Sequence, residues 1–295
     1  MPGSIIAANG VDLCVETFGP PADPAIVLVH GHPPRPWWEE ELCERISASG
    51  RYVIRFDNRD TGRSVAYPPG QPGYSLPTLA DEVIGILDAL GIERAHLVGR
   101  SMAGAIVTVA ALQHAARVAS LTLISTTPGG ADLPPMSDEA IGYTSAGGPD
   151  PADPAAVVAF IVGLMRVYGG GSPYYDEAAM RAIAERDIAR TANIASCLTN
   201  HFVMAFGEPN RHRLGEIHVP TLVVHGECDP VFPLAHGRAL QKEIPGAELL
   251  VLDKVGHELP GSSRWRVRAG VLYRCDWEVA SHADRCLGRS AGGHR

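Results

Sequence analysis

Residues 94–112 read Arg-Ala-His-Leu-Val-Gly-Arg-Ser-Met-Ala-Gly-Ala-Ile-Val-Thr-Val-Ala-Ala-Leu. The apolar run at 95–98 indicates a buried strand, and the small apolar residues from Ala105 onward favour a helix. Ser101 stands between the two. A strand that runs into a helix through a tight turn, with a serine at the apex, describes a nucleophile elbow. The stretch therefore predicts a reactive serine at the end of a buried strand.

Small residues surround this serine, as a strained backbone and a close approach of helix to strand require. They are Gly99, Ala103 and Gly104. The usual pattern is Gly-x-Ser-x-Gly, whereas here alanine stands at the last position and a glycine follows it. Alanine at a position chosen for close packing is a small change, so the elbow remains the interpretation.

Short apolar runs on both sides of the elbow are typical of strands covered on both faces of a sheet. They lie at 25–29, 52–56, 121–125, 221–225 and 248–252. Helical segments are expected at 37–47, 79–90 and 234–243, and Asn9-Gly10 predicts an edge hairpin within 5–16. Strands that alternate with helices indicate an α/β fold with a mostly parallel sheet flanked by helices.

The alternation stops after residue 125. Residues 126–154 are rich in Gly, Pro, Asp and Ser, and helical patterns without a strand follow up to residue 206. We interpret this part as a helical insertion over the C-terminal edge of the sheet. The expected units are a first core part at 1–128, a helical cap at 129–214, a second core part at 215–262 and an atypical tail at 263–295.

Composition excludes several classes of protein. The chain has 295 residues, 45% of them hydrophobic, and a formal net charge of −8, which argues against nucleic acid as a partner. No apolar run approaches the roughly 20 residues of a membrane helix, and the first residues lack the pattern of a signal peptide. Six scattered cysteines without Cys-x-x-Cys spacing favour a reduced, cytoplasmic protein without a zinc site.

A base and an acid follow the serine in the order that this kind of sheet uses: nucleophile, acid, histidine. Asp229 comes just after the run at 221–225, and His257 comes just after the run at 248–252. The C-terminal ends of parallel strands meet at one sheet edge, so we expect these two side chains to lie beside Ser101. Serine needs an adjacent base that an acid orients, and the three together predict a catalytic triad.

Other assignments compete with this one. Ser101 could be a plain helix N-cap, and Asp229 before a proline could be a turn residue. Glu227 is a second acid near the end of the same strand. His225 falls inside the strand, where a core role is expected.

The oxyanion of the reaction needs preorganised donors. The N–H of Met102, directly after the serine, is the first candidate, and the N–H of His32 is the second. Gly31 would allow the close approach. His30 and His32 could also belong to a metal site, but no third ligand is suggested by spacing. Among the residues of the next loop, Asp57, Arg59 and Asp60 are expected to form a buried structural charge network.

At these residues the chain resembles the α/β-hydrolase family, over residues 10–262. The residues that carry the resemblance are His30-Gly31, the loop 57–64, the elbow 99–104, the segment 226–229 and Gly256-His257. Within the family, 58–64, Met102 and 256–260 are similar to an actinobacterial esterase group that includes the aclacinomycin methylesterases, which act on polyketide antibiotics. The resemblance implies an eight-stranded sheet with a cap after the sixth strand, and a triad of Ser101, Asp229 and His257.

We therefore expect a serine hydrolase that cleaves a carboxylic ester or lactone, polyketide-like or otherwise small and apolar, through an acyl-serine intermediate. No cofactor or metal is expected, and the protein would be a monomer or homodimer with neither nucleic acid nor membrane as partner. Candidates for binding substrate are Gly31, Arg100, Phe160, Leu164 and Phe202, together with Met165, Tyr168 and Met204.

Alternatives with the same triad are carbon–carbon bond hydrolysis, cofactor-free perhydrolysis and iminopeptide cleavage. Haloalkane dehalogenases and epoxide hydrolases are disfavoured, because they carry an aspartate where Ser101 stands. A non-catalytic ligand-binding protein of this fold is a further alternative.

Overall fold

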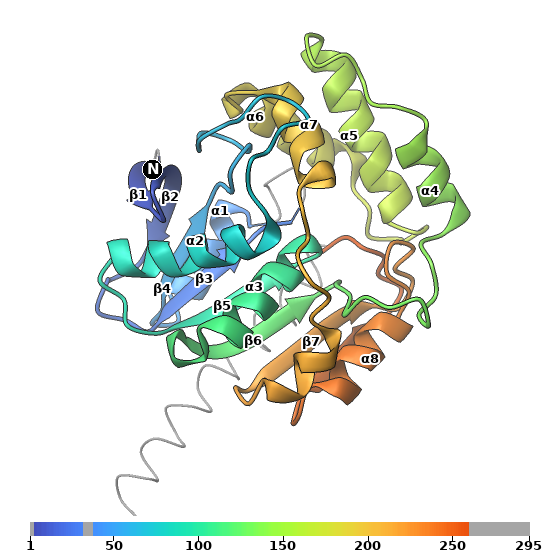
Figure 1. The fold of residues 1–295 in the computed structure, drawn as a ribbon. Helices are drawn as coiled ribbons and strands as arrows, with labels where there is room; N and C mark the ends of the chain where they lie inside the picture. Colours follow the sequence, from blue (N-terminus) through green and yellow to red (C-terminus); the bar gives the residue numbers. More distant parts are fainter. Residues whose placement is uncertain (1–2, 32–37, 260–295) are drawn as a thin grey trace, which may run out of the picture.

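A computed structural model describes residues 3–31 and 38–259 of the chain. The described residues form an eight-stranded sheet with the order β1-β2-β4-β3-β5-β6-β7-β8 (Figure 1). The strands are β1 Ser4–Ala8, β2 Val11–Phe18, β3 Ala25–Val29, β4 Tyr52–Phe56, β5 Ala95–Arg100, β6 Val118–Ile124, β7 Thr221–Gly226 and β8 Glu248–Leu252. β2 pairs antiparallel with both β1 and β4, and every other pair is parallel. The predicted α/β fold class is confirmed, and the hairpin at Asn9-Gly10 lies at the sheet edge.

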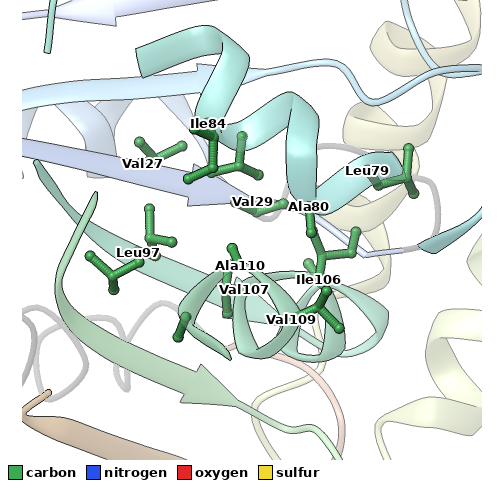
Figure 2. Close-up of a cluster of buried hydrophobic side chains, with 14 of the residues drawn as sticks. Val27, Val29, Leu79, Ala80, Ile84, Leu97, Ile106, Val107, Val109 and Ala110 are labelled. Atoms are coloured by element: carbon green, nitrogen blue, oxygen red, sulfur yellow. The ribbon is translucent and has the colours of Figure 1, made fainter. Parts of the chain in front are cut away.

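Helices cover both faces of this sheet. Helices α2 Leu76–Ala89, α3 Met102–Gln113 and α8 Ala235–Glu243 contribute to one hydrophobic cluster, and α1 Glu40–Ser47 contributes to a second. Successive side chains of a strand point to opposite faces, so Val27 and Val29 join the first cluster while Ile26 and Leu28 join the second. Figure 2 shows Val27, Val29 and Leu97 facing α2 and α3. This two-sided burial explains why the central strands read as unbroken apolar runs.

Four helices lie between β6 and β7 in the sequence, and we refer to them as the inserted helices. They are α4 Asp138–Ser145, α5 Pro154–Tyr168, α6 Glu177–Arg190 and α7 Ile194–Val203, grouped on one side of the sheet in Figure 1. Each begins at a side chain that accepts from its first turn: Ser137, Asp153, Asp176 and Asn193. Sequence analysis missed α4, which is short and lies in the Gly- and Pro-rich stretch.

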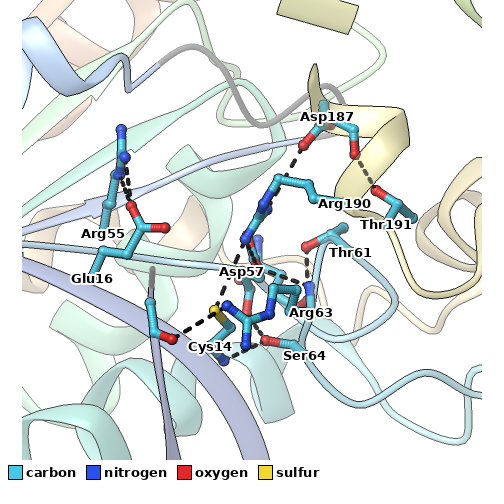
Figure 3. A network of polar contacts seen from close by, with 12 residues as sticks. Cys14, Glu16, Arg55, Asp57, Thr61, Arg63, Ser64, Asp187, Arg190 and Thr191 are labelled. Atoms are coloured by element: carbon cyan, nitrogen blue, oxygen red, sulfur yellow. Dashed lines mark hydrogen bonds and ion pairs between the residues drawn. The ribbon is translucent and has the colours of Figure 1, made fainter. Parts of the chain in front are cut away.

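A buried ion pair ties the inserted helices to the sheet. Arg190, at the end of α6, donates to both oxygens of Asp57 just after β4, at 2.8 and 2.6 Å. The Asp57 side chain is fully buried, and Figure 3 shows it between Arg190 and the loop that carries Arg63 and Ser64. A Cβ at Gly62 would overlap both partners of the pair, so the loop needs glycine there. Loss of Arg190 would leave the buried Asp57 carboxylate without its counter-charge.

A second set of polar contacts joins the same loop to α7. The Asp60 carboxylate accepts from the Tyr74 hydroxyl at 2.6 Å and from the Asn200 amide at 2.9 Å. Arg59 pairs with the buried Glu82 carboxylate. The expected buried charge network is therefore present, and it also holds the inserted helices.

Within the described residues, no helix is both long and apolar enough to cross a bilayer.

His201 makes this attachment sensitive to pH. Its Nε2 donates to the Arg59 carbonyl at 2.9 Å, and burial lowers the pKa of the imidazole to about 4. Because the folded-state pKa lies below the unfolded value of 6.5, the unfolded chain binds the proton first, and stability is lost as pH falls below 6.5. We expect this group to lower the free energy of unfolding by about 2 kcal/mol between pH 7 and pH 5.

Urea titrations of the wild type and of His201→Gln at both pH values measure this effect. Glutamine does not titrate, so the pH dependence of the variant should be weaker by that amount. Parallel pH dependence in the two proteins would contradict the prediction.

Candidate active site

The serine of the elbow occupies a strained backbone position between β5 and α3. Ser101 has φ 55° and ψ −127°, and its side chain caps no helical N–H. A non-glycine residue at positive φ is held there by its surroundings. A Cβ at Gly99 would overlap the Ala103 carbonyl, and one at Gly104 would overlap the Thr126 side chain. The N-cap alternative is not supported, because the Ser101 hydroxyl is bonded elsewhere.

The structure brings the three predicted triad residues together. His257 Nε2 lies 2.9 Å from Ser101 Oγ, and His257 Nδ1 lies 2.8 Å from Asp229 Oδ2. Ser101 follows β5, Asp229 follows β7 and His257 follows β8, all at the C-terminal edge of the parallel strands. An acid that holds an imidazole against a hydroxyl is the arrangement that activates serine as a nucleophile.

Two backbone N–H groups hold the Asp229 carboxylate in place. Asp229 Oδ1 accepts from the N–H groups of Val231 and Phe232, both at 2.9 Å. Burial alone would raise the pKa of this carboxyl, but the charge and hydrogen bond of His257, with help from His225 and the backbone, hold it below its usual value. The carboxylate is therefore ionised at neutral pH and accepts from Nδ1, which leaves Nε2 free to take a proton from the serine.

Glu227, the alternative acid, and His225, the histidine inside the strand, make other contacts near the site. Glu227 is exposed and accepts from the backbone N–H of Lys254 at 3.2 Å, away from the histidine. His225 is buried in β7, where its Nε2 donates to the Phe232 carbonyl at 2.6 Å and lies 3.7 Å from Asp229 Oδ2. Burial lowers its pKa. His225 thus supports the loop that carries the acid, a contact that its place inside a strand did not reveal.

The N–H of Met102 lies at the start of α3, beside the serine, where an oxyanion would accept from it. The other predicted donor, His32, lies outside the described residues. Gly31, just before it, approaches the elbow so closely that an added Cβ would lie 3.1 Å from Ser101 Cβ and 3.2 Å from Met102 N. His30 turns into the fold, where its Nε2 lies 3.3 Å from the Asn58 N–H.

Gly31→Ala is expected to lower kcat by about 10²- to 10³-fold, the usual effect of losing one oxyanion donor. The new methyl group would lie 3.2 Å from Met102 N, within hydrogen-bonding range of that donor, and 2.7 Å from the Arg100 carbonyl oxygen, so it would crowd the space around this N–H. The check is steady-state hydrolysis of a p-nitrophenyl ester. Gly142→Ala, in α4, is a matched control because its Cβ would meet no atom within 4 Å. Equal kcat values in both variants would count against this location of the oxyanion.

A cavity of about 850 Å³ opens onto the serine. Five of the predicted substrate-binding residues line it: Gly31, Arg100, Phe160, Leu164 and Phe202. Met165 and Tyr168 line it as well, whereas Met204 does not and instead packs in the first hydrophobic cluster. Sequence analysis missed Phe206 and Phe232, which also line the cavity. The walls are largely apolar, as in most sites for small molecules.

Two arginines line the cavity among the described residues, and both are engaged by protein groups. The Arg100 guanidinium is buried and donates to the His257 carbonyl. Arg211 donates to both oxygens of Asp132 and both oxygens of Glu243. The charge of Arg211 is therefore compensated by two carboxylates, whereas Arg100 donates to a neutral carbonyl. In the part of the chain that the structure describes, no group of three or more His, Cys, Asp or Glu side chains could hold a metal ion.

Comparisons with known proteins identify the family and the fold. A family model described as "alpha/beta hydrolase fold" matches residues 24–261. The chain is 30% identical to rhodomycin D methylesterase of Streptomyces sp. (strain C5), over 88% of this chain and 93% of that protein. It is 32% identical to a 2-hydroxy-6-oxononadienedioate/2-hydroxy-6-oxononatrienedioate hydrolase of Paraburkholderia phymatum, over 79% and 80%. A meta-cleavage product hydrolase from Pseudomonas fluorescens superposes with a TM-score of 0.75 at 21% identity, over 94% and 98%.

Proposed function

The chain belongs to the α/β-hydrolase family and is a hydrolase acting on esters; within that frame we propose that it works through an acyl-serine intermediate. The observation that carries the proposal is the continuous hydrogen-bonded series from Asp229 through His257 to Ser101, which ends in an apolar cavity. A binding protein of this fold would have no need of a strained serine bonded to an oriented imidazole. The proposal therefore favours an enzyme over the non-catalytic alternative.

In the proposed mechanism, Ser101 Oγ attacks the ester carbonyl while His257 Nε2 takes its proton. The Met102 N–H stabilises the oxyanion, and the N–H of His32, in the loop after the first central strand, is the second donor that we propose. The protonated His257 then gives its proton to the leaving alkoxide. Water, activated by the same imidazole, releases the acid and restores the serine. Asp229 remains ionised throughout and holds the imidazole in the productive orientation.

For the substrate, we propose the methyl ester or lactone of a bulky, apolar molecule of the polyketide type. The named methylesterase relative acts on rhodomycin D, and the apolar cavity is large enough for a molecule of several fused rings. Carbon–carbon hydrolysis of a dienedioate would bring two carboxylates into the site. The pairing of Arg211 with Asp132 and Glu243 and the largely apolar walls argue against that substrate, because an ionised carboxylate is costly to bury without a counter-charge.

We further propose that residues 129–214, which include the inserted helices, act as a cap that selects the substrate. The α5 and α7 helices and the segment after α7 supply much of the cavity wall, whereas the proposed triad comes entirely from the sheet edge. Six scattered cysteines without Cys-x-x-Cys spacing support the proposed cytoplasmic location.

A substrate panel tests the proposal. We would measure kcat/KM of the purified protein for three classes of substrate. These are methyl esters of polycyclic aromatic acids, small lactones and 2-hydroxy-6-oxodienedioates. We expect the polycyclic methyl esters to be cleaved with the highest kcat/KM and the dienedioates with the lowest. Preference for the dienedioates would reject the ester assignment in favour of the carbon–carbon hydrolase.

A further inference from the structure

The backbone of the histidine in the triad is held by the end of α5. The N–H of His257 donates to the Tyr168 carbonyl at 2.8 Å. The Tyr168 ring also meets the imidazole edge-on, with ring centroids 5.4 Å apart and planes at 82°. One residue of the inserted helices thus contacts both the main chain and the ring of His257.

Glycines on both sides of this contact allow the two segments to touch. A Cβ at Gly256 would overlap the Gly169 carbonyl and would lie 2.7 Å from the Tyr168 carbonyl oxygen. The backbone of Gly256 lies outside the left-handed region, so the approach of α5 is what excludes a side chain. A Cβ at Gly170 would lie 2.5 Å from the Cys228 carbonyl, directly before Asp229. The turn after α5 therefore packs against both loops that carry the acid and the base.

The carbonyl group of His257 is held by a residue of the nucleophile elbow. Arg100, next to Ser101, donates to the His257 carbonyl. The carboxylate of Glu258, the next residue, accepts from the Gly256 N–H at 3.0 Å. The histidine is thus fixed at its N–H by the inserted helices and at its carbonyl by the sheet.

We propose that Tyr168 and the turn after it, residues 168–172, are a positioning element for His257. The base reaches Ser101 in the productive orientation when the inserted helices are docked against Gly256. Tyr168 also lines the substrate cavity, so the residue that a bound substrate touches is the one that holds the base. This inference rests on the proposed function, because it assigns His257 the role of base.

Phosphonylation of Ser101 by a fluorophosphonate tests the proposal without knowledge of the natural substrate, since the reaction needs the same base. Gly256→Ala should lower the labelling rate by about 10²-fold, the usual consequence of displacing a catalytic group by an ångström. Gly142→Ala adds the same methyl group in α4, where it meets no atom within 4 Å, and should label at the wild-type rate. The thermal unfolding midpoint of each variant is measured alongside.

Two substitutions at Tyr168 keep the test informative if Gly256→Ala does not fold. Tyr168→Ala removes the ring from the imidazole and should lower the labelling rate by about 10-fold, while Tyr168→Phe keeps the ring and should recover most of that loss. With a p-nitrophenyl ester, the loss should fall on kcat and not on KM. Because unfolded protein would also lower the apparent kcat, kcat is calculated per active site, counted from the final extent of fluorophosphonate labelling.

The outcomes separate the two proposals. If wild type is labelled at Ser101 and the folded Gly256→Ala and Tyr168→Ala variants are labelled equally fast, the positioning role is wrong and the proposed function stands. A loss that falls on KM alone, or equal rates for Tyr168→Ala and Tyr168→Phe, also overturns the positioning role. If wild type is not labelled, the proposed function fails, and the inference fails with it.

Discussion

Replacing Ser101 with alanine is expected to lower kcat for a p-nitrophenyl ester by about 10⁴- to 10⁶-fold, the range seen when a triad nucleophile is removed. The hydroxyl lies 2.9 Å from His257 Nε2 and is the nucleophile that we assign to the described active site. Without it, no acyl-enzyme forms, and the remaining rate comes from oxyanion stabilisation and from water. Binding should persist, because the cavity walls are unchanged.

The measurement pairs steady-state hydrolysis with fluorophosphonate labelling of the intact protein. Ser4→Ala is a suitable control, because Ser4 is exposed in β1 at the far edge of the sheet. We expect the control to match wild type in both assays and Ser101→Ala to lose both signals. Wild-type turnover in Ser101→Ala would remove the serine from the mechanism and with it the acyl-serine intermediate.

The sequence was sufficient to predict that the three proposed triad side chains meet, because of a property of parallel sheets. Strand ends that are far apart in sequence lie at one edge, so Ser101, Asp229 and His257 could be placed together before any contact was known. The glycines of the elbow could be predicted from the sequence as well, because the close approach of α3 to β5 leaves no room for a side chain. Local chemistry and one topological rule were enough for these residues.

Other contacts near the site could not be predicted, because no pattern of residue types in the sequence marks them. The bond from His257 to Tyr168 is accepted by a backbone carbonyl, which every residue possesses, so no residue type marks it. The ion pair between Asp57 and Arg190 joins residues 133 positions apart, and the arginine resembles any exposed helical arginine in the sequence. Met204 was placed in the cavity because it is apolar, yet the position directly after α7 turns it into the core. Such contacts depend on how the inserted helices dock, which periodicity does not determine.

Asp229→Asn is expected to lower kcat by about 10⁴-fold, although the new side chain has nearly the same shape. In the wild type, Oδ1 accepts from the N–H groups of Val231 and Phe232, and Oδ2 faces His257 Nδ1. An asparagine must place its amide oxygen at the two backbone donors, so its NH₂ group faces Nδ1 and donates to it. The proton of the imidazole then sits on Nε2, which can no longer accept the proton of Ser101.

Glu227→Gln is the matched control, since it changes the neighbouring carboxylate in the same way. Glu227 is exposed and accepts only from the Lys254 N–H among its described contacts, so kcat should stay within about 2-fold of wild type. Fluorophosphonate labelling should fall together with kcat in Asp229→Asn, because phosphonylation needs the same proton transfer. A larger loss in Glu227→Gln than in Asp229→Asn would transfer the role of acid to Glu227 and would contradict the tautomer argument, since Oδ1 and its two backbone donors belong to Asp229.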